Sequence, residues 1–516
     1  MSTFSPFDLP LLHQPSAPPE GQLPEPSPSL GELPEPIPSE GHAPEPGPSV
    51  GEAREPIPSE SQPPAFEPLA LAGGPTPAPT AARRILVLTH SHPAITRGGA
   101  ELAALRLYEG LTALPDRSAF FLGCGRDPSG GRAGQAITQP FGEGDFLYTS
   151  AGYDWFKFAN HDERFPRDFA DLLRRTRPDV LHFHHYSNLG IEALLIARRT
   201  LPNCRIVMTL HEFQAICHHY GQMITRHSRT LCYKASPRDC TRCFPEYSRA
   251  DFFLREHYVR RFLALVDRFI APSHFLAERY IAWGLPAARM SVLENVIADA
   301  TPAPPTPTAP RAPNQVLRAG FFGQISFLKG IQVLFDAAAI LEDEGVSNVV
   351  VNIHGDHTGQ PEEFREEFLA SLAKAGRNVR FHGPYDNQRV DGLMRTNDVI
   401  VAPSVWWENS PVVIQEARRN RIPIICSDIG GMAEKVRHGT DGWHIPVGSA
   451  PELANLLRSL AANPHQLDHL RATIAPTTPS QTAIAEHTTL YDALFATPPA
   501  TDEANASTAG EHQPPR

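Results

Sequence analysis

Two carboxylates in the segment "WWENSPVVIQEARRN" (406–420) are the residues whose types and spacing first suggest chemistry. Glu408 and Glu416 flank a Ser-Pro step, with seven residues between them. Paired carboxylates can serve as a general acid and a general base, or they can bind hydroxyl groups without moving a proton. A purely structural alternative is one acid near a helix start and one acid on the surface. The spacing alone leaves these alternatives open.

The residues between the two acids predict an anion site. Ser410 followed by Pro411 is a typical pair for the cap and first position of a helix, so a helix should begin there. Val412 and Val413 would then present free backbone N–H groups in the first turn, where the helix dipole favours a phosphate. The apolar run "DVIVAPS" before this segment predicts a buried strand. The two acids would therefore lie on either side of an anion-binding turn.

A second stretch, "GFFGQISFLKG" (320–330), has the pattern of a strand, a glycine-containing loop and a helix. Gly323 permits close approach of a ligand to the backbone. Lys329 places a positive charge at the end of the loop, as in many phosphate sites, although an ordinary surface lysine is the alternative. The stretch has neither a G-x-G-x-x-G nor a Walker pattern, which argues against a dinucleotide or nucleoside-triphosphatase site.

Two stretches of the chain alternate strand-like and helix-like segments and would position these residues. The first stretch, 83–298, opens with "RRILVLTHSH", and the second, 314–479, contains "NVVVNIHGD" and "IPIICSD". This alternation predicts two α/β domains with doubly wound parallel sheets. Ligands of such sheets bind beyond the carboxyl ends of the strands, so the cleft between the domains is the expected site. A last helix is expected over 480–495.

Proline-rich segments flank and separate these domains. Residues 1–80 are rich in Pro and Glu and contain four decapeptide repeats, which predicts a disordered tail. The tail could bind a partner or act as a solvated spacer. Residues 299–313 predict a semi-rigid linker, and 496–516 a second disordered tail.

The net charge of −11 is concentrated in the tails, because residues 1–80 carry −10 and residues 501–516 carry −2. The remainder is about +1, which argues against a nucleic-acid partner. The sequence contains no run of about 18 apolar residues, so no membrane-spanning segment is predicted. The start lacks the pattern of a secretory signal. Seven cysteines fit a reduced compartment better than a disulfide framework. We therefore expect a cytoplasmic protein.

Four cysteines gather within 27 residues, in an insertion over 217–243 that otherwise offers little hydrophobic core. The last two form a C-x2-C pair, which is typical of zinc knuckles. A structural zinc site with four thiolates is one hypothesis, and buried free thiols or disulfides are the alternatives. The ligands would be Cys217, Cys232, Cys240 and Cys243.

Histidines end two of the expected strands in the first stretch. In "LHFHHY" (181–186), His182 and His184 lie on one strand face, where they could bind a metal or line the cleft. His211 could be a core histidine or a contact to a ligand. The segment 251–269 predicts a basic amphipathic helix, which either packs on the sheet or docks at a membrane surface.

The whole pattern resembles a retaining, two-domain (GT-B) glycosyltransferase of family 4. The resemblance covers roughly 83–495, and the E-x7-E signature followed by "PIICSDIGGMAE" is its most specific part. The other matching pieces are "GFFGQISFLKG", "VNIHGDHTG", "VRFHGPY", "RGGAE", "HEF" and "FIAPSHFLAERYIAWGL". The resemblance implies two Rossmann-like domains facing a cleft. It also implies transfer of a hexose from a nucleotide sugar of the UDP or GDP type to a saccharide or lipid-linked acceptor.

The resemblance also implies roles for single residues on the donor side. Glu416 would bind the ribose hydroxyls, Glu408 the hydroxyls of the donor sugar, and Lys329 the diphosphate. Gln324 stands where the family usually has Arg, which weakens one cationic contact. Further donor contacts are implied for Gly323, Asn409, Ser410, Val412, Val413 and, near the base, Tyr385.

On the acceptor side, Gly98 and Gly99 would approach the diphosphate or the acceptor, and His211 would contact the sugar across the cleft. Because relatives act on lipid-linked acceptors, peripheral contact with the inner membrane face is a further expectation. The catalytic group would be Glu408, Lys329 and His211, with no cofactor required for catalysis. The family pattern implies a same-face substitution in which the leaving phosphate helps to deprotonate the acceptor.

Other functions fit the same architecture. A sugar-nucleotide epimerase could share the fold, and a phosphorylase would need a lysine-bound pyridoxal phosphate to which nothing in the sequence points. A non-catalytic scaffold would be favoured by loss of Glu408, Glu416 or Lys329, and all three are present.

Overall fold

The structure is a computed structural model that describes residues 82–96, 98–125, 134–150, 152–299 and 315–496. The predicted tail over 1–80 lies outside the described residues. Residues 300–313 of the predicted linker and residues 497–516 of the second predicted tail also lie outside the described residues.

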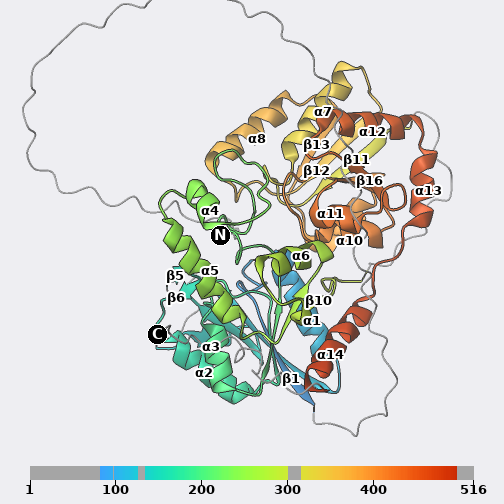
Figure 1. The fold of residues 1–516 in the computed structure, drawn as a ribbon. Helices are drawn as coiled ribbons and strands as arrows, with labels where there is room; N and C mark the ends of the chain where they lie inside the picture. The colour runs from blue at the N-terminus through green and yellow to red at the C-terminus, as the bar shows by residue number, and fades with distance from the viewer. Residues whose placement is uncertain (1–81, 97, 126–133, 151, 300–314, 497–516) are drawn as a thin grey trace, which may run out of the picture. The chain divides into compact units, whose positions relative to one another are not determined.

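The first half of the described chain forms an eight-stranded sheet with the order β10-β9-β8-β7-β1-β2-β4-β3 (Figure 1). All pairings are parallel except the one between β3 and β4. The strands are β1 (Arg83–Leu88), β2 (Arg117–Gly125), β3 (Ile137–Thr138), β4 (Asp145–Thr149), β7 (Val180–Phe183), β8 (Arg205–Thr209), β9 (Arg268–Ala271) and β10 (Met290–Val292). A separate two-stranded pair consists of β5 (Tyr153–Asp154) and β6 (Ala159–Asn160).

Six helices belong to this half, and most of them follow a strand and cover the sheet. They are α1 (Gly99–Thr112), α2 (Phe165–Thr176), α3 (Ala193–Thr200), α4 (Pro237–Cys243), α5 (Arg249–Leu263) and α6 (His274–Trp283). Helix α5 begins with a capping box in which Ser248 and Asp251 bond to each other's backbone N–H groups. The capping box fixes the start of the helix that follows the cysteine-rich segment.

The second half forms a six-stranded, fully parallel sheet with the order β13-β12-β11-β14-β15-β16. Its strands are β11 (Leu317–Phe322), β12 (Val349–His354), β13 (Val379–Gly383), β14 (Val399–Ala402), β15 (Ile424–Ser427) and β16 (Gly442–Ile445). Its helices are α7 (Ile331–Asp343), α8 (Glu362–Lys374), α9 (Val390–Met394), α10 (Val412–Arg419), α11 (Gly430–Lys435), α12 (Ala450–Ala462) and α13 (His465–Thr473).

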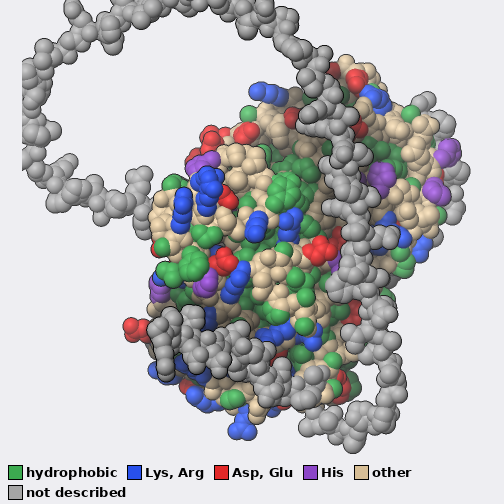
Figure 2. Space-filling view, viewed as in Figure 1, with side chains coloured by type: hydrophobic (Ala, Val, Ile, Leu, Met, Phe, Trp, Pro, Cys, Tyr) green, Lys and Arg blue, Asp and Glu red, His purple; other side chains and the backbone are tan. Residues whose placement is uncertain are grey.

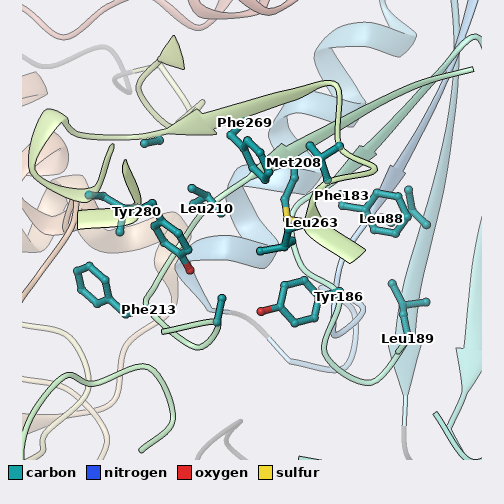
Figure 3. Packing of buried hydrophobic residues seen from close by; sticks show 14 of the residues in the cluster. Leu88, Phe183, Tyr186, Leu189, Met208, Leu210, Phe213, Leu263, Phe269 and Tyr280 are labelled. Carbon is teal, nitrogen blue, oxygen red and sulfur yellow. The ribbon is translucent and has the colours of Figure 1, made fainter. Parts of the chain in front are cut away.

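The central strands are mostly apolar because both faces of a parallel sheet are covered by helices. The last four residues of β1 are fully buried, as are the four residues of β15. Figure 3 shows the core of the first half, where Phe183, Met208 and Phe269 from adjacent strands lie near Tyr186 and Tyr280. The predicted class of two doubly wound α/β domains is confirmed.

The last helix, α14 (Ser480–Ala496), follows the second half in sequence but packs against the first half beside α1 and β1 (Figure 1). The hydroxyl of Tyr491 lies 2.7 Å from Nδ1 of His182 in β7. Asp492 accepts hydrogen bonds from Arg83 at 2.6 Å and Arg117 at 2.7 Å. The chain therefore ends, within its described residues, on the domain in which it began.

The described surface carries both signs of charge. Figure 2 shows Lys and Arg side chains alongside Asp and Glu side chains over one face of the molecule. No helix in the described part of the chain is both long and apolar enough to cross a membrane.

Candidate functional site

The loop between β11 and α7 carries the lysine that the sequence singles out. Gly323 opens this loop with φ +128°, a conformation that side chains disfavour. Gln324 follows it and is half-buried. The backbone N–H of Lys329 donates to Ser326 Oγ at 3.4 Å, and α7 begins two residues later. The loop therefore delivers a lysine to the carboxyl end of β11.

Lys329 and Glu408 meet although they are far apart in sequence. The Nζ of Lys329 donates to Oε1 of Glu408 at 2.6 Å. The same oxygen accepts from Ser404 Oγ at 2.9 Å and from Trp406 Nε1 at 2.9 Å. Three donors on one oxygen hold this buried carboxylate in a fixed position. The sequence prediction identified Glu408 and Lys329 but missed Ser404 and Trp406.

Helix α10 begins at Val412, and its cap differs from the prediction. The N-cap residue is Pro411, without a side-chain cap, so the prediction of Ser410 as the cap is wrong. Instead, Ser410 Oγ donates to Glu294 at 2.6 Å. This charge-assisted hydrogen bond to a carboxylate fixes the position of the hydroxyl. The helix starts at Val412, one residue after the predicted start at Pro411, and Val412 and Val413 lie in its first turn as predicted.

Glu416 lies in the middle of α10 and is buried. Burial raises its pKa to about 7, an effect that Arg419 opposes and Asp391 reinforces. The guanidinium of Arg419 binds Asp391 at 2.8 Å and lies 4.0 Å from Glu416. Because Arg419 is engaged mainly by Asp391, Glu416 has only a partial counter-charge.

An aromatic group lies close to Glu416. The ring of Tyr385 meets Phe322 edge-on, with centroids 5.6 Å apart, and Phe322 stacks on His354 at 4.5 Å. Burial and the nearby Glu416 raise the pKa of the Tyr385 hydroxyl. These rings come from the ends of β11, β12 and β13, so the structure assembles an aromatic surface beside the acid.

The first half of the chain reaches this region through the start of α1. Gly98 is the N-cap residue of α1 and Gly99 its first residue. A Cβ on Gly99 would lie 3.6 Å from Val412 Cγ2. Residues of both halves, Gly99 and Val412 as well as Glu416, line a cavity of about 50 Å³. Pockets for nucleotide-sized ligands are larger, roughly 300–1,000 Å³.

His211 follows β8 and connects the two halves through its backbone. Its carbonyl oxygen accepts from Asn409 Nδ2 at 2.7 Å. Its Nε2 lies 3.0 Å from Nδ1 of His184, at the end of β7. Burial lowers the pKa of His211 to about 3, and nearby histidines add to the effect. The ring is therefore neutral at physiological pH.

The other strand-end histidines form a buried group with assigned partners. His182 lies between Tyr491 and Thr209 Oγ1, each at 2.7 Å. The rings of His182 and His184 are 4.5 Å apart, and burial lowers the pKa of both. Hydrogen bonding to side chains within the core explains their positions, and only His184 touches a predicted site residue.

Two further acids, neither of which was predicted as a site residue, join the halves near the site. Glu294 accepts from Ser410 and binds Lys435 Nζ at 2.6 Å. Glu434 accepts the backbone N–H groups of His274 at 2.9 Å and Phe275 at 2.8 Å. Glu434 thus stabilises the N-terminal end of α6, where the helix dipole favours a negative charge.

The two adjacent tryptophans have different roles. Trp406 donates to Glu408, as described above, whereas Trp407 is buried and faces the cysteine-rich insertion. The Nε1 of Trp407 donates to Cys232 O at 3.2 Å, and its ring stacks on Phe275 at 5.3 Å. Tyr233 meets the same ring edge-on at 5.1 Å. Trp407 therefore links the sugar-side loop to the insertion.

The cysteines of the insertion are half-buried and none forms a disulfide in the described chain. Among the described residues, no three or more His, Cys, Asp or Glu side chains are already arranged to hold a metal ion. The zinc hypothesis for Cys217, Cys232, Cys240 and Cys243 stays a prediction. The other three cysteines, Cys124, Cys204 and Cys426, are buried in the core.

Helix α5 packs on the first domain, which favours one of the two alternatives for this segment. Phe252, Val259 and Leu263 are buried, whereas Phe253 and Leu254 are 52% and 61% exposed. Docking at a membrane surface stays a prediction.

Two family models match the chain in adjacent regions. "Glycosyltransferase Family 4" matches residues 97–300, and "Glycosyl transferases group 1" matches residues 309–475. The first region contains Gly98, Gly99 and His211, and the second contains Lys329, Glu408 and Glu416.

Curated relatives match over part of their length. The D-inositol 3-phosphate glycosyltransferase of Arthrobacter sp. (strain FB24) is 31% identical over 145 residues, which are 28% of this chain and 34% of the relative. The phosphatidyl-myo-inositol mannosyltransferase of Mycobacterium leprae (strain TN) is 27% identical over 189 residues, 36% of this chain and 48% of the relative. The chain thus spans about a third to a half of these relatives.

Solved structures share the fold over most of their length. Sucrose-phosphate synthase from Thermosynechococcus elongatus superposes with a TM-score of 0.57 at 17% identity, covering 80% of this chain and 99% of the other. Anabaena Alr3699/HepE in complex with UDP-glucose gives a TM-score of 0.51 at 17% identity, covering 80% and 98%. At this identity the similarity establishes the GT-B fold alone.

Proposed function

Because the chain is a GT-B glycosyltransferase of the family 4 type, we propose that it transfers a hexose from a nucleotide-diphosphate sugar to a saccharide or lipid-linked acceptor, with retention of configuration. The observation that carries the proposal is the contact of 2.6 Å between Lys329 and Glu408. It joins the loop after β11 to the segment that leads into the first turn of α10. A cation, a fixed carboxylate and helix amides at one strand edge suit a sugar diphosphate.

The diphosphate would bind between Lys329 and the first turn of α10. Breaking the bond between the sugar and the diphosphate builds negative charge on the leaving group. A lysine and the N–H groups of Val412 and Val413 can stabilise that charge, because they are held in place before the reaction begins. The protein's own groups would thus stabilise the charge of the leaving diphosphate.

The donor sugar would lie against Glu408. The three hydrogen bonds to this carboxylate all use Oε1, so the lone pairs of Oε2 can accept from sugar hydroxyls. In this proposal Glu408 orients the sugar and does not take a proton.

The nucleoside would bind between Glu416 and Tyr385. A half-paired carboxylate is a strong acceptor for two adjacent ribose hydroxyls, and an aromatic ring can pack against a base. The open state that admits the donor must be wider than the present cavity of about 50 Å³. Separation of the two halves at Gly99 and Val412 would provide that space.

Retention in this proposal does not need a covalent intermediate. The acceptor hydroxyl attacks from the face that the diphosphate leaves, and an oxygen of the departing phosphate takes the hydroxyl proton. His211 is neutral and its ring is tied to His184, so it would contribute a hydrogen bond to the sugar rather than a charge. The names of the curated relatives favour an inositol-containing or lipid-linked acceptor as the first to be tested.

A panel of UDP and GDP sugars tests the proposal. Nucleoside-diphosphate release is measured with and without inositol phosphate, saccharide and lipid-linked acceptors. We expect one base to be preferred and release to depend on an acceptor, with the product's anomeric configuration, measured by NMR, matching that of the donor. Binding of a nucleotide sugar without turnover by any acceptor would favour a scaffold, and an inverted product would refute retention.

A further inference from the structure

The cysteine-rich segment 217–243 lies between β8 and α5 and is built mainly from turns. An isolated antiparallel bridge joins Ile224 and Leu231, and the N–H of Cys232 donates to Met223 O at 2.8 Å. The short helix α4 ends the segment and has no buried residue. The segment has little core of its own, so other interactions must hold its shape.

The four thiols of this segment form two neighbouring pairs, of which Cys217 and Cys232 pack against the main core and Cys240 and Cys243 against a smaller aromatic cluster. Cys217 lies within electrostatic range of Cys232 and Cys240, and Cys243 lies within range of the same two. Cys240 and Cys243 are three residues apart on α4, so they share one helix face. Both pack against the aromatic cluster that contains Phe244. The fold thus collects residues that are up to 26 positions apart.

Backbone N–H groups point at two of the sulfur atoms. The N–H of Arg226 donates to Sγ of Cys243 at 3.1 Å. The backbone of His219, two residues after Cys217, hydrogen-bonds to the Cys217 thiol. Such N–H groups stabilise negative charge on sulfur, as the outer-shell hydrogen bonds of metal sites do.

A buried cation lies beside these thiols. Arg255 of α5 is only 4% exposed, and its guanidinium donates to the carbonyls of Phe156 at 2.8 Å, Ala215 at 3.0 Å and Gln214 at 2.6 Å. No ion pair of this guanidinium with a carboxylate occurs in the described part of the chain. Burying a charge without a counter-charge is strongly unfavourable.

Glu212 also lies within electrostatic range of Arg255, but burial raises its pKa to about 8, so the thiols are the groups that remain to supply the missing charge. Cys217 and Cys240 both lie within electrostatic range of Arg255. As neutral thiols they cannot compensate a guanidinium. Four thiolates around a divalent cation carry a net charge of −2, which would compensate Arg255 at the position where the fold has buried it.

We propose that this segment binds one structural Zn²⁺ through its four thiolates, those of Cys217, Cys232, Cys240 and Cys243. Binding releases the four thiol protons to solvent and forms four Zn–S bonds, with no change of oxidation state. The described side chains are not already closed around a metal position. Closure moves turns and a helix without buried residues, so the ion's binding energy is available to order the segment.

The ion would also stabilise the contact between the insertion and the sugar-side loop. The carbonyl of Cys232 accepts from Trp407, and Tyr233 packs on the same ring. The side chain of Arg229, in the same segment, lies over the ring of Phe327 in the loop before Lys329, at 4.7 Å. Zinc would therefore hold the insertion against two loops of the second half without touching the donor.

Metal analysis of the full chain tests the proposal. The protein is purified under reducing conditions, without a metal-binding tag, and its metals and thiols are counted. We expect about one zinc per chain, and Co²⁺ exchanged into the site should show the absorption of a tetrahedral thiolate complex. Absence of both zinc and cobalt uptake would overturn the proposal, as would iron with inorganic sulfide, or disulfides among these four residues.

Two pairs of variants locate the ion. Cys240→Ser should lose the zinc, whereas Cys204→Ser, a buried cysteine outside the segment, should keep it. Arg255→Met should weaken zinc binding by about 10–100-fold in competition with a chelator, as loss of an outer-shell partner does. Arg261→Met, an exposed arginine on the same helix, should not. If Cys240→Ser does not fold, the metal content and cobalt spectrum of the unaltered chain still decide the question.

Discussion

The two halves of the molecule bring different chemistry to the carboxyl ends of their parallel strands. In the second half, the loops after β11 and β14 deliver Lys329 and Glu408, which are charged and in direct contact. In the first half, β7 and β8 are followed by His184 and His211, which are paired with each other and kept neutral by burial. The same architecture thus presents charges on one side and neutral hydrogen-bonding rings on the other.

This difference suits the two ends of a nucleotide sugar. A diphosphate needs fixed positive charge, because its negative charge grows as the bond to the sugar breaks. Sugar hydroxyls need donors and acceptors at fixed positions, and a neutral imidazole offers one of each. We therefore expect charge changes in the second half to affect turnover more than changes to the histidines of the first half.

The largest effect is expected for Lys329→Met, which removes the cation and leaves Glu408 with two of its three partners. We expect kcat/KM for the preferred donor to fall by about 10²–10³, because a charge-stabilising group is lost. Steady-state kinetics measure the effect. Lys374→Met, at the exposed end of α8, is the matched control and should behave as the unaltered enzyme. Equal kinetics for both variants would remove Lys329 from the site.

Glu416→Gln should have a smaller effect on the reaction than Lys329→Met, and it should make the protein more stable at high pH. The variant should raise KM for the donor by about 10-fold, because ribose hydroxyls bind a carboxylate more strongly than an amide. The folded protein raises the pKa of Glu416 from 4.5 to about 7, so this residue favours folding below pH 4.5 and loses that contribution as the pH rises through 7.

The variant should therefore stabilise the free enzyme at pH 8, by up to about 3 kcal/mol, and much less at pH 5. Thermal unfolding at the two pH values measures this difference. Donor affinity of the unaltered enzyme should also fall as the pH drops below about 7, and Glu416→Gln should flatten that dependence. A variant that is less stable than the parent at pH 8 would contradict the assigned pKa.

A weaker effect is expected for His184→Phe, which removes the hydrogen bond to His211 and keeps an aromatic ring. We expect kcat/KM to fall about 5–10-fold, as for loss of one hydrogen bond. Because burial keeps both rings neutral, the pH profile between 6 and 8 should not change. An altered profile would show that a histidine titrates in this range. His257→Phe, on an exposed part of α5, is the control.

The smallest effect is expected for Trp407→Phe. This variant loses the hydrogen bond to Cys232 O but keeps a ring against Phe275. We expect less than about a threefold change in KM and about 1 kcal/mol lower stability, measured by kinetics and denaturant unfolding. A large rise in KM for the donor would show that the insertion controls the sugar-side loop more strongly than the contacts suggest.

Much of this structure could be predicted from local patterns in the sequence. The buried strands, the alternation with helices and the E-x7-E segment each depend on neighbours in sequence, so the fold class and the presence of a helix with Val412 and Val413 in its first turn could be predicted. Lys329 was identifiable because it follows a glycine loop after a strand. Its contact with Glu408 was not predicted, since 79 residues separate the two.

Contacts between distant segments explain what was missed. Ser410 has the right type and position for a helix cap, but in the structure its hydroxyl donates to Glu294, 116 residues away. Glu434 ends the "PIICSDIGGMAE" segment, yet nothing in that segment indicates its contact with the start of α6, 160 residues away. Both residues lie in distinctive local patterns, but their partners are supplied by tertiary structure.

The return of α14 to the first half has a consequence for engineering. Tyr491 and Asp492 serve β7, β1 and β2, although they follow every strand of the second half in the chain. A hybrid enzyme with a foreign donor-binding half must therefore be spliced at two points, one before β11 and one between α13 and α14. With a single crossover, the last helix would come from the foreign protein and would not match the surface of the first half. His182 and Arg83 would then lose their contacts with Tyr491 and Asp492.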